Sequence, residues 1–244
     1  MLENYMKEFE KNINDSFTRD NVLNSSFLLD REGDIEIYYA PHNEIINKRA
    51  KVCIVGITPG WTQTLISYNT VTECLRNNTN DLLEIKRLCK YNARFAGSMR
   101  NNIIEMLNEL KLNEFLSIKD CKQLFEELEL LHTTSLIPYP VFVKGHNYTG
   151  FNPSILESKL LSQYLNQYFI NEIKMLNDVL IIPLGKAVEK VLSELIFSGT
   201  IKEEQCLLGF PHPSGANGHR KKQFDCNKEQ MRDKIKVVFN SNNK

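Results

Sequence analysis

Four short apolar runs are the clearest pattern in this chain. Residues 52–55 form a continuous run of β-branched and apolar side chains, which is typical of a strand buried on both faces of a parallel sheet. Similar runs occupy residues 179–184 and 206–210, and the leucine-rich stretch 128–131 with the following Thr133, Thr134 and Leu136 indicates another strand. A glycine or a proline follows each run, and proline stops a strand because it cannot donate a backbone hydrogen bond. The pattern therefore predicts four core strands.

The segments between these runs carry apolar residues at helical spacing. Residues 99–112 place apolar side chains on one face. Asn152 and Pro153 offer a cap and a first position for another amphipathic helix. Strands separated by helices indicate an α/β fold, a single doubly wound domain whose four-stranded parallel central sheet is flanked by helices. Further helices are predicted over residues 81–91, 186–197 and 228–239.

The first 49 residues differ from this pattern. They predict a short helix within residues 1–25, followed by a hairpin of residues 27–29 and 35–39 that ends at Pro41. We expect residues 1–49 to be an N-terminal extension that covers one edge of the sheet. The core then spans residues 50–240 of a single domain, 1–244.

Composition narrows the functional classes. A hydrophobic fraction of 42% and a charged fraction of 25% are those of an ordinary globular protein, and no run approaches the ~20 apolar residues of a membrane span. The six cysteines include no C-x-x-C pair, so we expect no metal, iron–sulfur cluster or other cofactor. Cysteines in apolar runs and a polar N-terminus predict a cytoplasmic protein, which we expect to be a monomer without membrane contact.

The stretch from residue 206 to residue 224 carries the strongest chemical signal. His212 lies between two prolines at the end of the predicted fourth strand, so its backbone is rigid. A fixed imidazole, a loop of small residues and a basic stretch suit catalysis on a polyanion. The alternative from local chemistry is a strand followed by a solvated turn. The loop residues are Ser214, Gly215, Ala216, Asn217 and Gly218, and the basic stretch is His219, Arg220, Lys221 and Lys222.

A second turn follows the first core strand. Gly56-Ile57-Thr58-Pro59-Gly60-Trp61 places glycines on both sides of a proline, which favours a tight turn with backbone amides open to a ligand. In doubly wound sheets, ligands bind beyond the carboxyl ends of the strands. The loops at Gly56, His132 and His212 are predicted to lie at such ends and to converge.

Four segments together resemble one family. Gly-Ile-Thr-Pro-Gly at 56–60, Phe-Ala-Gly-Ser at 95–98, Ile-Ile-Pro-Leu-Gly-Lys-Ala at 181–187 and His-Pro-Ser-Gly at 212–215 are similar to motifs of the uracil-DNA glycosylase superfamily. The resemblance covers about residues 50–240. It implies an enzyme that hydrolyses the N-glycosidic bond of a damaged or modified base flipped out of single- or double-stranded DNA. Base repair and antiphage defence against modified phage DNA are both open, and the alternative is a non-catalytic DNA-binding or lesion-sensing module of the same fold.

The resemblance also implies residue roles. The turn of Gly56 and Thr58 would hold the attacking water, and His212 would donate a hydrogen bond to the base carbonyl as negative charge develops there. The base pocket would be formed by Ile57, Trp61, Gln63, His132 and Tyr148. DNA contacts would come from Gly97, Ser98, Arg100, Ser214, Gly215, Ala216, Asn217, Arg220 and Lys221.

Two positions depart from the family pattern. Thr58 stands where many members carry Asp, Asn or Glu, and a hydroxyl can orient a water but is a very poor base. Backbone carbonyls of the same turn are the alternative anchor for the water. His132 stands where uracil-reading members place Asn, and it cannot present the same donor and acceptor pair, which puts uracil itself in question. Its alternative is a satisfied strand-end residue, while Trp61 could be a core anchor and Tyr148 part of a surface loop.

Overall fold

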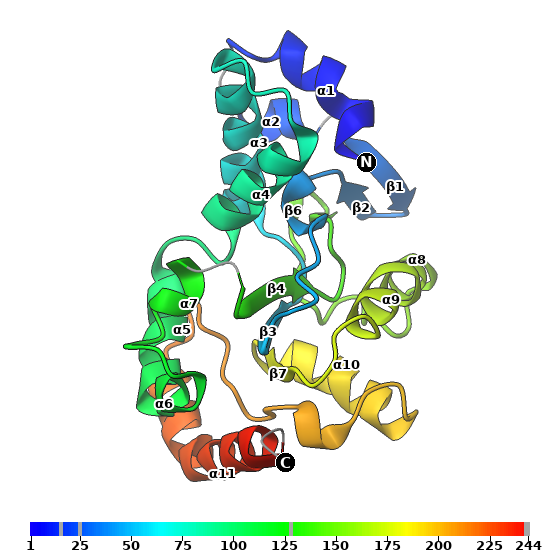
Figure 1. Ribbon diagram of the computed structural model, residues 1–244. Helices are drawn as coiled ribbons and strands as arrows, with labels where there is room; N and C mark the ends of the chain where they lie inside the picture. The colour runs from blue at the N-terminus through cyan, green and yellow to red at the C-terminus, as the bar shows by residue number, and fades with distance from the viewer. Residues whose placement is uncertain (15–16, 24–25, 127–128, 242–244) are drawn as a thin grey trace. The chain divides into compact units, whose positions relative to one another are not determined.

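The computed structural model in Figure 1 describes residues 1–14, 17–23, 26–126 and 129–241. The chain divides into two compact units. Unit 1 contains Met1–Ile46, Thr58–Ala96 and Ile137–Tyr164, and unit 2 contains Asn47–Ile57, Gly97–Leu136 and Leu165–Lys244. Leu128, within the predicted second strand, and parts of the predicted helix in 1–25 lie outside the described residues. The single-domain assignment stays a prediction.

Unit 2 is built around a parallel sheet. Its centre is β3 (Val52–Gly56), flanked by β4 (Leu131–Ser135) and β7 (Leu180–Pro183), both parallel to it. Every residue of the three strands is buried, as the apolar runs of β3 and β7 predict for strands covered on both faces. The strand β4 differs, because four of its five buried residues are polar. The α/β class is therefore confirmed.

The predicted fourth strand is reduced to one bridge. Cys206 forms an isolated parallel bridge to Ile181, and Phe210 O accepts from Gly185 N at 3.1 Å, but no strand is assigned between them within the described residues. The interruption is Gly209, whose φ is +88°. Its N–H donates to Glu189 Oε2 at 2.7 Å and its carbonyl accepts from Asn227 Nδ2 at 2.9 Å. The backbone N–H and C=O of Gly209 are bound by these two side chains and do not pair with β7. The described part of the parallel sheet therefore has three strands.

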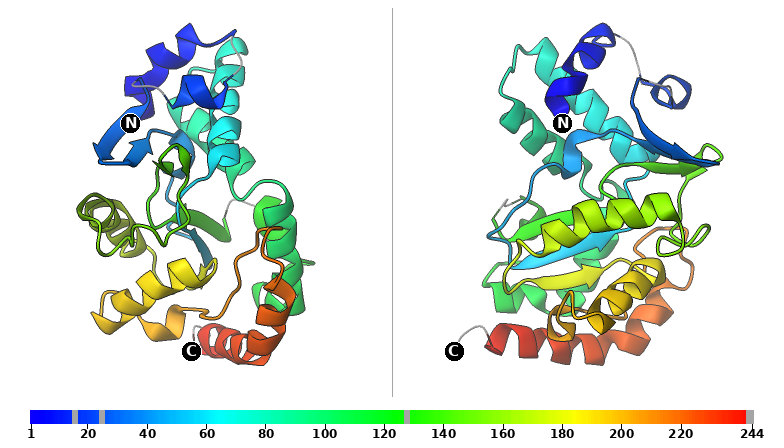
Figure 2. Two further views of the ribbon diagram at one scale, coloured as in Figure 1. Left: turned by 180° about the vertical axis from the view of Figure 1, so that it is seen from behind. Right: turned by 90° about the vertical axis from the view of Figure 1, so that its right-hand side faces the viewer.

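Helices cover both faces of this sheet. In Figures 1 and 2, α9 (Ile170–Ile173) and α10 (Lys186–Phe197) lie on one side, and α5 (Ser98–Glu109) and α6 (Leu112–Leu116) lie on the other. Unit 2 is therefore doubly wound. The predicted bounds of α10, residues 186–197, are confirmed. The remaining helical elements of unit 2 are α7 (Gln123–Glu126), the π-helical turn η2 (Leu165–Phe169), the 3₁₀ turn η3 (Glu203–Gln205) and α11 (Arg220–Ser241).

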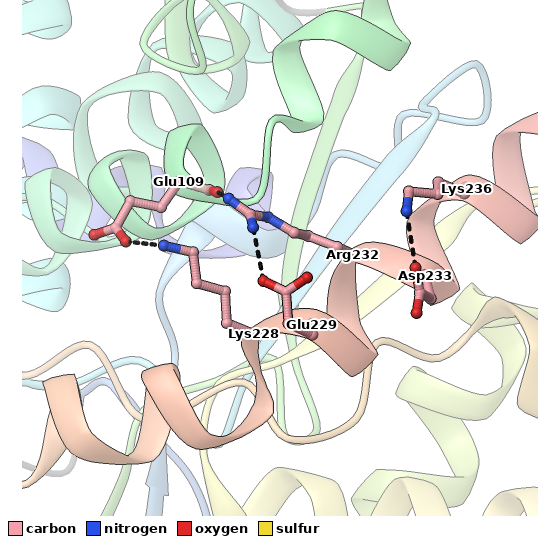
Figure 3. Close-up of polar contacts among 6 residues, drawn as sticks. All are labelled: Glu109, Lys228, Glu229, Arg232, Asp233 and Lys236. Atoms are coloured by element: carbon pink, nitrogen blue, oxygen red, sulfur yellow. Dashed lines mark hydrogen bonds and ion pairs between the residues drawn. The ribbon is translucent and has the colours of Figure 1, made fainter.

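The last helix begins at Arg220, earlier than the predicted Lys228, and is tied to α5 (Figure 3). Lys228 Nζ lies 2.6 Å from Glu109 Oε2. Arg232 Nη2 donates to Glu109 O at 2.8 Å, which caps one of the last carbonyls of α5, and Arg232 Nη1 also pairs with Glu229. These bonds fix the course of α11 and therefore the place of its first turn.

Unit 1 combines a small antiparallel sheet with helices. The hairpin of β1 (Leu28–Glu32) and β2 (Ile35–Tyr38) is confirmed, but it pairs with β5 (Val141–Val143), which pairs in turn with β6 (His146–Asn147). The predicted helix after Asn152 begins only at Lys159. The helical elements of unit 1 are α1 (Leu2–Lys11), α2 (Arg19–Val22), η1 (Pro41–Asn43), α3 (Trp61–Arg76), α4 (Leu82–Ala93) and α8 (Lys159–Tyr164).

Aromatic side chains fill the core of unit 1. Phe9 and Phe27 pack against Tyr68 with ring centroids 5.1 and 4.6 Å away, and Tyr68 donates its hydroxyl to Tyr39 O at 2.5 Å. Across the described ranges, no helix is long and apolar enough to cross a membrane.

Candidate active site

The carboxyl ends of the three parallel strands are held together in unit 2. Leu136 N, just after β4, donates to Gly56 O at 2.9 Å, and Leu184 N, just after β7, donates to Val55 O at 2.9 Å. Gly56 is buried and Ile57 is half-buried. This edge of the sheet is where ligands bind in doubly wound folds, so it is the natural frame for the site.

His212 is packed against the junction between β7 and α10. Gly185, which caps α10, has φ +85° and ψ 174°, a backbone region open essentially to glycine alone. A Cβ placed on Gly185 would lie 2.7 Å from Cβ of His212 and 3.2 Å from its Cα and N. The missing side chain at position 185 therefore lets the His212 backbone approach the end of β7.

The imidazole of His212 has a defined orientation. Its Nδ1 accepts a hydrogen bond from Ser214 N at 3.3 Å, so in the neutral ring the proton resides on Nε2. Burial lowers the pKa of His212 below its ordinary value. The ring is thus kept neutral, and its Nε2–H is a hydrogen-bond donor.

The loop after His212 is held from three sides. Asn217 Nδ2 donates to His212 O at 3.1 Å. Asn102 Nδ2, from α5, donates to Pro213 O at 2.7 Å, and Arg220 Nη1 donates to Ser214 O at 3.1 Å. The predicted DNA-binding residues of this loop are thereby brought together beside His212, with Ser214 and Asn217 half-buried and Gly215 and Ala216 exposed.

Cations begin the helix that follows. Arg220 is half-buried, while Lys221 and Lys222 are exposed in the first turn of α11. The N-terminus of a helix carries partial positive charge, so cations there are unfavourable and an anion beside them is favourable. This turn is electrostatically suited to a phosphate.

The start of α5 supplies the other predicted phosphate contacts. Gly97 and Ser98 are exposed, and Gly97 caps the helix with φ +79°. The guanidinium of Arg100 packs over the ring of buried Phe125, with its Cζ 5.7 Å from the ring centroid. A role for these residues in DNA binding stays a prediction.

Thr58 lies in unit 1, where its hydroxyl joins two backbone groups. Thr58 Oγ1 donates to Tyr139 O at 2.6 Å and accepts from Val141 N at 3.0 Å. A hydroxyl has one proton to donate, and here the proton is committed to a carbonyl. Thr58 therefore fastens the turn to the start of β5, and one oxygen lone pair remains for a water.

The other predicted pocket residues of unit 1 also make structural contacts. Trp61 is half-buried and begins α3, where its N–H donates to Asn147 Oδ1 at 3.1 Å. Gln63 Oε1 caps the same helix by accepting from Gly60 N at 2.7 Å. Tyr148 is buried and donates its hydroxyl to Pro153 O, and burial raises its pKa. Their contact with a base stays a prediction.

The chain has a close relative whose name assigns it no function. Uncharacterized protein YoxB of Bacillus subtilis (strain 168) is 44% identical over 237 residues, covering 95% of this chain and 92% of YoxB. The chain belongs to the YoxB family. No protein-family model matches it. Among solved structures, that of wild-type Pedobacter heparinus SMUG2 aligns with a TM-score of 0.45 and 16% identity, covering 98% of this chain and 97% of that chain.

The position of His132 in this YoxB-family chain corrects the sequence interpretation. It was expected at the carboxyl end of the second strand, but it is the second residue of β4 and pairs in register with Cys53, while Ser135 stands opposite Gly56 at the strand end. The ring is fully buried, Nε2 contacts Glu172 Oε1, and Nδ1 accepts from Asn47 N at 3.3 Å. Both ring nitrogens are engaged inside unit 2, so His132 is a core residue of β4, and its contact with a base stays a prediction.

Three residues that hold predicted site residues within their own units were given no role by the sequence. Gly185 permits the approach of His212, Asn102 holds the following loop, and Tyr139 receives the Thr58 hydroxyl. The role of Gly185 could have been predicted from the sequence, because a glycine between a buried strand and a helix often marks close backbone approach. No local sequence pattern indicates the roles of Asn102 and Tyr139, since their hydrogen-bond partners are distant in sequence.

Proposed function

We propose that this YoxB-family protein is a DNA glycosylase, an enzyme that hydrolyses the N-glycosidic bond of an altered or modified base flipped out of DNA. The observation that carries the proposal is the state of His212. It is a half-buried imidazole, kept neutral by partial desolvation, whose Nε2–H is the donor, at the carboxyl edge of a parallel sheet. The four motif segments and the basic turn after the loop are the supporting observations.

The chemistry follows from the protonation state. When the bond between base and sugar breaks, the electron pair goes to the base, and negative charge collects on a carbonyl oxygen. A neutral imidazole can donate Nε2–H to that oxygen without losing the proton. The carbonyl edge of the base becomes a better acceptor as the reaction advances, so the bond strengthens toward the transition state.

DNA as the partner is supported by local charge. The chain has 30 basic and 30 acidic residues, so attraction to a polyanion must come from a cluster and not from net charge. Lys221 and Lys222 are exposed at the positive end of α11, an arrangement that costs about 0.3–1 kcal/mol per residue and that a bound phosphate relieves. The exposed tip of Gly215 and Ala216 is small enough to enter the space that a flipped base leaves.

The attacking water is assigned to backbone groups of the turn 56–61. The Thr58 hydroxyl donates to Tyr139 O, so it can at most accept from a water, and the turn contains no carboxylate. This observation also favours the second candidate, a lesion-sensing module that binds DNA without chemistry. A mechanism without a general base requires that the leaving base depart with most of the bonding electrons before water adds.

One experiment separates these candidates. The wild-type chain is incubated with single- and double-stranded oligonucleotides carrying uracil, hypoxanthine or xanthine and with glucosylated phage DNA, and abasic sites are scored by alkaline cleavage. The glycosylase proposal expects abasic sites in at least one substrate. Selective binding of a lesion without abasic sites supports the sensing module, and no binding and no cleavage on every substrate contradicts both.

A further inference from the structure

Arg220 was expected to grip phosphate, and its contacts indicate a different task. We propose that Arg220 is a positioning residue, which together with Asn102 holds the loop that orients His212. The consequence for catalysis rests on the glycosylase function proposed above, whereas the structural role of Arg220 does not.

The contacts form a small closed network between two helices and the loop. Arg220 Nη1 donates to Ser214 O at 3.1 Å, and Arg220 Nη2 donates to Asn102 Oδ1 at 3.0 Å. Asn102 Nδ2 in turn donates to Pro213 O at 2.7 Å. Two consecutive carbonyls, those of Pro213 and Ser214, are therefore held from α5 and α11 at once.

This network bears directly on the His212 ring. Ser214 is the residue whose N–H donates to His212 Nδ1, so fixing the Ser214 backbone fixes the bond that selects the Nε2–H tautomer. Asn217 N also donates to Ser214 O at 3.0 Å, which makes that carbonyl the shared acceptor of the loop and of Arg220. Loosening the Ser214 carbonyl should therefore loosen the imidazole.

Arginine is the residue type that this geometry requires. Its planar guanidinium presents rigidly spaced donors that can reach two acceptors at once, whereas a lysine ammonium is a single point charge on a flexible stem. Both supports are themselves anchored, since Lys228 and Arg232 of α11 bind Glu109 at the end of α5. Contacts to DNA phosphate from this turn then fall to Lys221 and Lys222, which are exposed.

The test compares variants that keep or remove the charge. Hydrogen exchange of residues 212–219 is measured by mass spectrometry in the wild type, Arg220→Lys, Asn102→Ala and the control Lys221→Ala. We expect exchange to rise by a factor of about 3–10 in the first two variants, the effect of one lost hydrogen bond, with no change in the control or in segments far from the loop. NMR of the imidazole nitrogens should show a smaller Nε2–H population in Arg220→Lys.

The affinity for an unmodified duplex oligonucleotide separates positioning from phosphate binding. Lys221→Ala should lower the slope of log affinity against log salt by about 0.9, while Arg220→Ala, which removes a charge but no phosphate contact, and Asn102→Ala should leave it unchanged. Wild-type exchange and an unaltered imidazole in both Arg220→Lys and Asn102→Ala would overturn the proposal. If the wild type does not bind the duplex, DNA recognition fails, and the exchange result still decides the role of Arg220.

Discussion

The backbone of Gly185 packs so closely against His212 that no side chain fits between them. Any side chain at position 185 would bring its Cβ to 2.7 Å from the His212 Cβ, a separation that real Cβ atoms do not adopt. The junction between β7 and α10 and the loop after Phe210 are thus mutually shaped. The position of the His212 imidazole thus depends on Gly185, a residue that has no side chain.

Gly185→Ala should be strongly destabilising and should displace His212. Two costs add: about 1–3 kcal/mol for a non-glycine residue at φ +85° and ψ 174°, and about 1–3 kcal/mol for overpacking against His212. Gly97→Ala is the matched control for stability, because Gly97 also caps a helix with φ +79° and ψ −147° but has nothing within 4 Å of its built Cβ. Urea unfolding should show a larger loss for Gly185→Ala, and equal losses would contradict the contact with His212.

Thr58→Val should lower stability more than it lowers any chemical rate. Removing the hydroxyl leaves Tyr139 O and Val141 N without that partner, which costs about 1–3 kcal/mol where the groups are buried. Thr58→Ser should keep most of the stability, and Thr62→Val on the exposed surface of α3 is the control. A fully stable Thr58→Val with turnover slowed by a factor of about 10–100 would instead restore the water-positioning role expected from the sequence.

The sequence predicts the centre of the fold well and its edges poorly, for physical reasons. Residues 52–55 and 180–183 were recognisable because a strand buried on both faces must be continuously apolar. The run at 206–210 is also apolar apart from Gly209, yet Glu189 and Asn227 bind the backbone N–H and C=O of that glycine. Those two side chains come from helices elsewhere in the chain, so no local pattern reveals that the ladder is broken.

The same limit applies to the site. His212 was recognisable because two prolines and a following small-residue loop are local features. The misplacement of His132 is a question of register, which the pairing of Ser135 with Gly56 decides. The committed hydroxyl of Thr58 depends on Tyr139, a residue far along the chain. Contacts between distant segments were thus the missing information in both cases.

Acid should destabilise the protein partly through His42. Burial, with a smaller effect of the charge on Lys90, lowers the pKa of His42 to about 3. Between its ordinary pKa of about 6.5 and that value, the unfolded chain binds a proton that the folded chain does not, so stability falls as pH decreases through this window. Over the whole window the lost stability would reach about 5 kcal/mol, since one pKa unit corresponds to about 1.4 kcal/mol. The free energy of unfolding, measured in urea between pH 7 and pH 4, should fall less steeply for His42→Gln than for the wild type or for the exposed-residue control His219→Gln.

The orientation of the His212 ring predicts an NMR signature. At pH 7 the ring should be neutral with its proton on Nε2, because Nδ1 accepts from Ser214 N and burial lowers the pKa of the ring. Protonation of Nδ1 would place two N–H donors, those of Nδ1 and Ser214 N, against each other, so acid should weaken the hydrogen bond between Ser214 N and His212. Long-range ¹H–¹⁵N spectra of the imidazole should show the Nε2–H form and a titration midpoint below the ordinary histidine pKa of about 6.5. A dominant Nδ1–H form would contradict the assigned hydrogen bond.

The most direct test of the central claim is base release by His212→Ala. The substrate is the DNA from which the wild type releases a base, the rate is measured in a single turnover with enzyme in excess, and binding to the same DNA is measured in parallel. Loss of one transition-state donor should slow base release by a factor of about 100–1,000 while DNA affinity changes little. His212→Ala that releases the base at the wild-type rate would contradict the claim that this imidazole stabilises the departing base.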